Sequence, residues 1–244
     1  MTHAFSIKEA IIFGWHKVKG HSRLVFAVVL TMFALQVVSS MVENSLKDTV
    51  LGAVASLVLA VAGIVLGAGA TLIVLKLAKG EHAAYRDIVP ALGLVWKYFC
   101  ASLLAGLISF LPLMAGGLAS LALLASTGSI NFSEGTPIAG HEWAFALAIG
   151  IMTVAACFAI YFAIRYSMAR LAVLDGADIL ESLPKSTKLT HNVKWRLVLF
   201  ALAIVGLNLL GLIALVVGLL VTIPISLLAF AHVYLKLKSH HGHN

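Results

Sequence analysis

Residues 197–235 read LVLFALAIVGLNLLGLIALVVGLLVTIPISLLAFAHVYL and decide the fold class, because these 39 positions contain no Asp, Glu, Lys or Arg. An α-helix rises about 1.5 Å per residue, so a single helix of this length would far exceed the roughly 30 Å hydrocarbon core of a bilayer. Two helices fit that thickness if the chain turns back near Gly211–Gly218, which places Pro224 in the first part of the second helix. The stretch therefore predicts a transmembrane helical hairpin.

Four more apolar runs precede this hairpin, and the composition agrees with a membrane protein. The chain is 61% hydrophobic and 11% charged, whereas a soluble domain carries about 25% charged residues. We expect one polytopic membrane domain over residues 1–244, with residues 239–244 as a disordered tail. The six predicted spans lie at about residues 24–42, 50–77, 98–126, 143–166, 197–214 and 217–235.

The basic residues orient these spans. Basic residues gather on the cytoplasmic side of bacterial membrane proteins. With both termini cytoplasmic, the inside segments 1–23, 76–97, 165–196 and 236–244 hold 16 of the 17 Lys and Arg residues. Only Lys47 falls outside. The charges therefore predict a multi-pass membrane protein with both termini in the cytoplasm, and they explain the net charge of +7 without nucleic acid.

Each pair of spans follows an inside segment with amphipathic character, at residues 5–19, 85–98 and 179–192. We therefore expect an all-α integral membrane fold with six transmembrane helices in three hairpins, each preceded by a cytoplasmic amphipathic segment. Such segments lie in the membrane surface with Lys and Arg toward the head groups. Two alternatives stay open: a true threefold repeat, and a third span that Pro112 either kinks or divides into two re-entrant halves.

The stretch from Arg165 to Tyr234 carries a family resemblance. A span ends in Arg165, an acidic turn follows at Asp175, and an amphipathic Ser-x3-Ser-x2-Leu segment leads to a basic stretch before the last hairpin. This pattern resembles the uncharacterised six-span inner-membrane proteins of the YciC type and the membrane domain of some glycerophosphodiester phosphodiesterases. The resemblance implies a six-span fold, a location in the bacterial cytoplasmic (inner) membrane and a link to membrane lipids, but no catalytic activity. The matching positions are Arg165, Asp175, Ser182, Ser186, Leu189, Asn192, Trp195 and Pro224.

The strongest binding candidates are the basic residues around the predicted segment 179–192. Each Lys or Arg near an anionic membrane surface contributes about 1 kcal/mol of attraction. These residues either form a pocket for a lipid phosphate, reach individually to the head groups, or pair with the nearby acids Asp175, Asp178 and Glu181. The candidate lipid phosphate-binding residues are Arg165, Arg170, Lys185, Lys188, Lys194 and Arg196.

Polar residues inside spans are the remaining candidates, because they are costly in lipid. Gln36 and Asn208 are expected to form hydrogen bonds between helices, and His232 to lie near the inner membrane surface. Gly63 and Gly67 are candidates for close helix packing. The final His-rich residues do not form a convincing metal site, so we expect no metal and no cofactor.

These features favour a non-catalytic protein. The sequence shows none of the common catalytic motifs, such as a phosphate loop, a His-Glu-x2-His pattern or a nucleophile elbow. We therefore expect a lipid-interacting scaffold, an assembly factor or a subunit of an envelope complex. Its partners would be anionic membrane lipids, together with another membrane protein or a second copy of the chain. A small transporter or channel is the alternative, and an intramembrane enzyme is less favoured.

Overall fold

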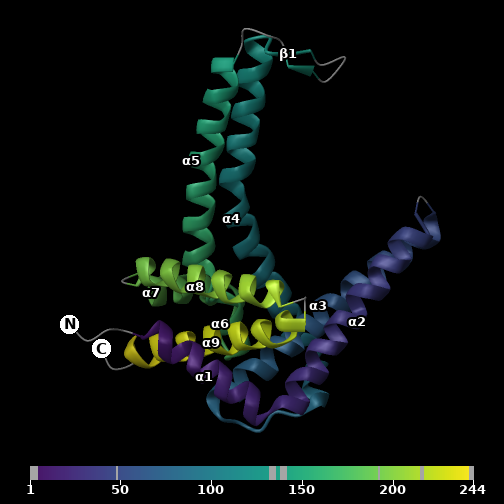
Figure 1. Cartoon of the computed structure of the whole chain (residues 1–244), viewed down its shortest axis with the longest axis vertical. Coiled ribbons are helices and arrows are strands. Elements are labelled where there is room, and N and C mark those ends of the chain that lie inside the picture. Colours follow the sequence, from purple (N-terminus) through teal and green to yellow (C-terminus); the bar gives the residue numbers. More distant parts are fainter. Residues whose placement is uncertain are drawn as a thin grey trace. The chain divides into compact units, whose positions relative to one another are not determined.

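The computed structural model of the chain describes residues 5–47, 49–131, 136–137, 142–191, 193–214 and 217–241. In these residues six helices are long and apolar enough to cross a membrane (Figure 1). This confirms the helical fold with six candidate spans. The long helices are α2 (Ser22–Ser45), α3 (Val50–Lys79), α4 (Leu92–Ser126), α5 (Glu142–Tyr166), α8 (Lys194–Ile213) and α9 (Val217–His241).

Shorter elements connect the long helices. The long helices follow one another in three pairs, α2–α3, α4–α5 and α8–α9, and each pair is preceded by a shorter segment. These segments are α1 (Ile7–Gly20), the 3-10 turn η1 (Tyr85–Ile88), and α6 (Ala169–Leu174) with α7 (Ile179–Thr190). A short antiparallel pair, β1 (Ile130–Asn131) and β2 (Thr136–Pro137), lies between α4 and α5. The chain divides into two compact units, one of Met1–Ala101 with Met168–Asn244 and one of Ser102–Ser167. The single membrane domain stays a prediction.

Both hairpins of the first unit close through glycines. A Cβ on Gly52 would lie 2.1 Å from the Leu46 carbonyl oxygen, so α3 begins directly against the end of α2. A Cβ on Gly218 would lie 2.4 Å from the carbonyl oxygen of Gly211. The turn between α8 and α9 therefore falls in the segment that the sequence predicted, Gly211–Gly218. Residues 215–216 lie outside the described part.

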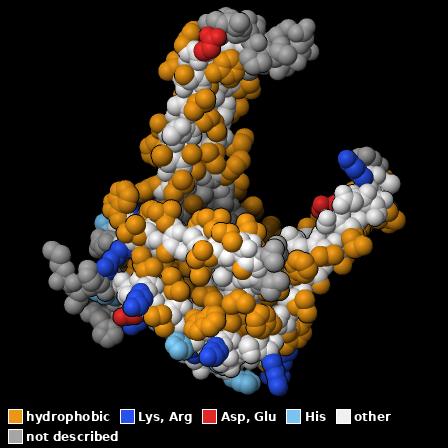
Figure 2. Space-filling model, viewed as in Figure 1, with side chains coloured by type: hydrophobic (Ala, Val, Ile, Leu, Met, Phe, Trp, Pro, Cys, Tyr) orange, Lys and Arg blue, Asp and Glu red, His pale blue; other side chains and the backbone are white. Residues whose placement is uncertain are grey.

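The second unit is the hairpin formed by α4 from Ser102 onward and by α5. Gly116 allows close contact, since a Cβ there would lie 2.4 Å from the Ala155 Cβ. Ser120 donates a hydrogen bond to the Ala148 carbonyl oxygen at 3.2 Å. Helix α4 continues through Pro112, which contradicts the re-entrant alternative for the third span. Hydrophobic side chains cover the visible face of this pair (Figure 2), as expected of helices in contact with lipid.

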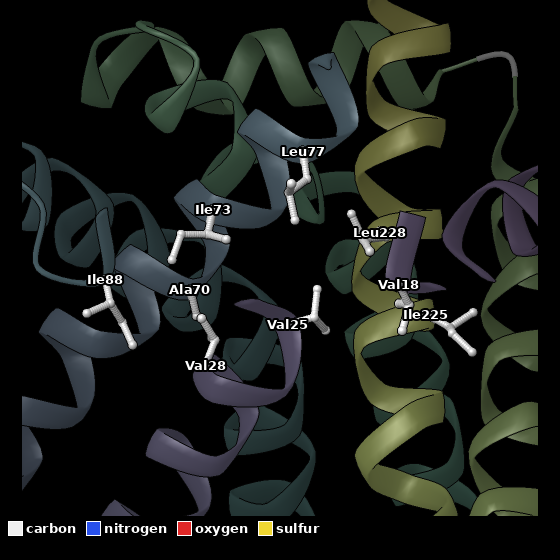
Figure 3. Packing of buried hydrophobic residues seen from close by; sticks show 9 residues of the cluster. All are labelled: Val18, Val25, Val28, Ala70, Ile73, Leu77, Ile88, Ile225 and Leu228. Atoms are coloured by element: carbon white, nitrogen blue, oxygen red, sulfur yellow. The ribbon is translucent and has the colours of Figure 1, made fainter. Parts of the chain in front are cut away.

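The core of the first unit lies where α1, α2, α3 and α9 meet. Helix α1 packs along α9 with Ala10, Gly14 and Val18 buried at a spacing of four residues. A Cβ on Gly14 would lie 2.5 Å from the Ile225 carbonyl oxygen, so this contact is between backbones. Figure 3 shows the side chains that fill the centre, namely Val18, Val25, Val28, Ala70, Ile73, Leu77, Ile88, Ile225 and Leu228.

Two predicted segments differ in detail from the structure. The amphipathic segment 85–98 divides into η1 and the start of α4, because Pro90 favours an extended residue before it and Val89 has φ −114° and ψ 86°. Helix α9 continues to His241, so the described part of the predicted disordered tail, 239–241, is helical; residues 242–244 lie outside the described part. The segments 5–19 and 179–192 match α1 and α7 closely.

Candidate functional site

Three aspartates connect the short segments of the first unit to the ends of its long helices. Asp175, after α6, accepts from Lys79 of α3 and Lys238 of α9. Asp87 of η1 pairs with Lys76 of α3 at 3.0 Å. Asp178, before α7, pairs with Lys97 of α4 at 3.1 Å. Four lysines that the sequence assigned to the cytoplasmic side therefore form ion pairs within the protein.

Asp175 is the most enclosed of these groups, with a side chain only 3% exposed. Its Oδ1 lies 2.7 Å from Lys79 Nζ, and its Oδ2 accepts from Lys238 Nζ at 2.5 Å and from Tyr234 Oη at 2.8 Å. Gly176 follows with φ 98°, a left-handed conformation that favours glycine and turns the chain from α6 toward α7. We call Asp175, Lys79, Tyr234 and Lys238 the Asp175 cluster.

The Asp175 cluster keeps its carboxylate charged. Burial alone would raise the pKa of Asp175, but the hydrogen bonds from Lys238, Lys79 and Tyr234 outweigh it and lower that pKa. Both carboxylate oxygens already accept strong hydrogen bonds. The arrangement therefore joins the C-terminal ends of α3 and α9 to the turn after α6, and it leaves Asp175 poorly suited to accept a proton from a substrate.

The other two aspartates act at more exposed positions. Asp87 accepts from the Ala84 backbone N–H at 3.0 Å and from Lys76, and these two hydrogen bonds lower its pKa. The hydrogen bond from Lys97 lowers the pKa of Asp178 in the same way, although Asp178 is 60% exposed. Each of these pairs fixes a short segment beside the end of a long helix.

Helix α7 explains the Ser-x3-Ser-x2-Leu pattern. Ser182, Ser186, Leu189 and Thr190 are buried, and α7 packs against α6. The Ser186 hydroxyl accepts a hydrogen bond from the Met168 backbone N–H at 3.2 Å, while Ser182 and Thr190 donate to backbone carbonyls of α7 itself. Small hydroxyl side chains therefore let two helices approach closely while satisfying their own polar groups.

The six candidate lipid phosphate-binding residues belong to both units and differ in their contacts. Arg165 belongs to the second unit and donates to Tyr161 Oη at 3.2 Å. Arg196 donates to the Phe5 carbonyl oxygen at 3.1 Å, which ties the start of α8 to the start of α1. Of the remaining four, all in the first unit, Arg170 and Lys188 are exposed, and Lys185 and Lys194 are half-buried.

Exposed tryptophans mark the starts of the long helices and were missed as candidates from the sequence. Trp96 and Trp195 are 62% and 82% exposed, and Trp15 on α1 is also exposed. Each is one or two positions from a Lys or Arg. Tryptophan beside basic residues is typical of a membrane–water boundary, so this spacing was a signal that the sequence already offered. Figure 2 shows Lys, Arg and His side chains around α1 and the termini, and also at the tip of the α2–α3 pair, where Lys47 lies.

The intramembrane polar candidates have different surroundings. Asn208 of α8 donates to Ser226 of α9 at 3.2 Å, the interhelical hydrogen bond expected for it. His232 stacks on Phe13 of α1 with ring centroids 4.2 Å apart, so it is half-buried within the unit. Gln36 lines a cleft between α2 and α3 and its side chain has no hydrogen-bond partner among the described residues, so the interhelical hydrogen bond expected for it is not found.

The predicted packing glycines, Gly63 and Gly67, allow less close helix contact than the nearby Gly69 does. A Cβ on Gly63 would be in ordinary contact with Leu35, and one on Gly67 would have nothing within 4 Å. The close approach is instead at Gly69, where a Cβ would lie 1.9 Å from the Ile88 carbonyl oxygen. Among the residues that the structure describes, no group of three or more His, Cys, Asp or Glu could hold a metal ion.

A family model described as "Protein of unknown function (DUF975)" matches residues 8–241. The chain belongs to this family. The part shared with DUF975 begins in α1 and reaches the last residue of α9, so it includes the Asp175 cluster and all six long helices. No curated protein and no solved structure matches the chain, so the resemblance to YciC-type proteins stays a prediction. The family and the six apolar helices together indicate a multi-pass membrane protein of uncharacterised role.

Proposed function

We propose that this protein is a non-catalytic scaffold of the bacterial cytoplasmic membrane that holds anionic lipids on its inner surface. In this proposal both termini are cytoplasmic and the protein is related to the YciC-type group. The observation that supports it most directly is the division of the basic residues. One set pairs with aspartates and fixes the short segments, whereas Arg170, Lys185 and Lys188 on α6 and α7 have no such partner among the described residues.

This second set lies on α6 and α7, where Arg170 and Lys188 are exposed and Lys185 is half-buried. None of the three has a hydrogen bond or ion pair within the described part of the chain. Leu180 of the same α7 helix is 75% exposed, and Trp195 follows at the start of α8. An amphipathic helix with exposed apolar and basic side chains binds an anionic membrane surface through both. The buried Ser182 and Ser186 fix the opposite face of α7 to the protein.

The transporter alternative receives less support. Asn208 is engaged with Ser226 in the α8–α9 hairpin, whereas Gln36 lines a cleft between α2 and α3. These polar groups therefore do not outline one shared pathway. The saturated carboxylate of Asp175 likewise gives no support to general base catalysis.

The experiment compares lipids retained by the full chain. Native mass spectrometry of protein in nanodiscs of phosphatidylcholine and phosphatidylglycerol should show phosphatidylglycerol enriched several-fold over its bulk share. The variant R170E/K185E/K188E should lose most of this enrichment, since about 1 kcal/mol per basic residue corresponds to a roughly fivefold change in affinity. Lys47→Glu, on the opposite predicted side, is the matched control. Equal retention in the triple variant and the wild type would contradict the proposal.

A further inference from the structure

The outer half of the α2–α3 hairpin contains a polar cleft that the proposed function does not use. Its volume is about 210 Å³. Gln36, Ser39 and Glu43 line it from α2, and Ser56 lines it from α3. Leu35, Leu59, Ala60 and Gly63 complete its wall. The cleft belongs entirely to one hairpin of the first unit.

The polar side chains of this cleft have no partners within the part of the chain that the structure describes. Gln36, Ser39, Glu43 and Ser56 form no side-chain hydrogen bond or ion pair among the described residues. Both helices are membrane-span candidates. A polar group that meets only hydrocarbon costs several kcal/mol, so a hydrated or polar occupant is expected at this position.

The order of the groups along α2 indicates the chemistry of that occupant. Glu43 lies two residues before the helix end at Ser45, whereas Gln36 lies seven residues before Glu43, or about 10 Å deeper along the helix. A cation therefore fits at the membrane boundary, and hydrogen-bond acceptors fit deeper, opposite the amide of Gln36 and the hydroxyls of Ser39 and Ser56.

We propose that this cleft binds the head group of a phospholipid carrying a primary amine, in the leaflet opposite the inner basic surface. The protonated amine pairs with Glu43, and the phosphate and ester oxygens accept hydrogen bonds from Gln36, Ser39 and Ser56. The acyl chains lie along Leu35 and Leu59. A volume of about 210 Å³ is smaller than the roughly 300 Å³ of a typical ligand pocket, which suits a head group whose chains remain in the membrane.

A second copy of the chain is a poorer occupant. A twofold contact through this face brings the two copies of Glu43 near each other, and like charges repel strongly where water is scarce. A soluble amine pairs with the Glu43 carboxylate but leaves Gln36 and Ser56 without hydrogen-bond partners. The amine phospholipid accounts for all four polar groups.

The test uses the full chain in nanodiscs of phosphatidylcholine and phosphatidylglycerol, with and without phosphatidylethanolamine. Native mass spectrometry should show phosphatidylethanolamine retained at least threefold over phosphatidylcholine. Glu43→Gln and Gln36→Leu should reduce the ratio toward that of the bulk lipid. Glu9→Gln, which removes a carboxylate from α1, and Ser40→Ala, which changes a neighbouring hydroxyl outside the cleft, should leave it unchanged.

Further variants keep the outcome decisive. Glu43→Asp retains the charge and should retain the enrichment, which separates loss of the amine contact from loss of folding. A wild-type ratio near the bulk value, or one that Glu43→Gln does not change, would overturn the proposal. Detection of a dimer without bound phosphatidylethanolamine would also overturn it. So would an increase in Tm with soluble phosphoethanolamine as large as the increase with phosphatidylethanolamine.

Discussion

At the scale of single residues, Asp175 shows how a charge can remain inside this protein. The cost of burying a carboxylate is offset only when charged donors surround it, and Lys79, Lys238 and Tyr234 supply them here. The sequence predicted an acidic turn at Asp175. It did not predict the partners, because Lys79 and Lys238 are far from Asp175 in the chain and only the packing of α3 and α9 brings them together.

Replacing Asp175 with Asn should destabilise the protein, because the two lysines lose a buried partner. We expect a loss of about 2 kcal/mol, or a fall in apparent Tm of roughly 4–8 °C in detergent. The folded-state pKa of Asp175 is lowered, so its contribution is complete above the unfolded pKa of about 4 and disappears as the pH falls through the folded value. In the Asp175→Asn variant, the apparent Tm should therefore fall less steeply with decreasing pH than it does in the wild type.

The control for this prediction is Asp178→Asn, because Asp178 also pairs with a lysine but is 60% exposed. Its apparent Tm should change little, since exposed ion pairs are screened by water. Equal effects of the two substitutions would show that burial does not set the strength of the Asp175 cluster.

At the scale of elements, glycine positions set how closely the short segments approach the long helices. Gly14 brings α1 against α9, and Gly69 brings η1 against α3. The sequence pattern indicated Gly63 and Gly67, because two glycines four residues apart are a common packing signal. That pattern does not say which neighbour lies opposite, and the neighbour at Gly69 is a 3-10 turn rather than a long helix.

Gly69→Ala should therefore be destabilising, because the new methyl group would meet the backbone of Ile88, which has no rotamer to change. Overpacking of this kind costs about 1–3 kcal/mol. Gly67→Ala, two residues away on the same helix and facing open space, is the matched control and should melt at or slightly above the wild-type temperature. Thermal unfolding of both variants in one detergent measures the difference. A fall in Tm for Gly67→Ala alone would contradict the packing described for η1.

At the scale of the whole molecule, hydropathy and charge predicted most of the architecture. The six apolar runs correspond to six long helices, and the turn in the last hairpin falls at its glycines, because length and apolarity are local properties of the chain. The candidate lipid-binding set was less predictable. Arg196 contacts the Phe5 carbonyl, and Asp175 and Asp178 pair with other lysines, because ion pairs depend on which helix ends meet.

The orientation of the chain in the membrane is a property of the whole molecule that can be tested directly. If 16 of the 17 basic residues are cytoplasmic, the α2–α3 and α4–α5 connections face outward and the ends of α3 and α9 face inward. Single cysteines at Lys47 and Ser126, in a variant lacking the two native cysteines, should react with a membrane-impermeant maleimide in intact cells. Cysteines at His82 and Ser239 should react only after permeabilisation.

The reverse labelling pattern would invert the protein and place the inner basic surface outside, where the proposed scaffold function no longer holds. A mixed pattern, with Lys47 and Ser126 on opposite sides, would mean that either α3 or α4, the two long helices between these positions, does not cross the membrane. Since each side carries two probes from different hairpins, these outcomes are distinguishable. The orientation of the basic surface and of the α2–α3 cleft is thereby tested independently of any lipid.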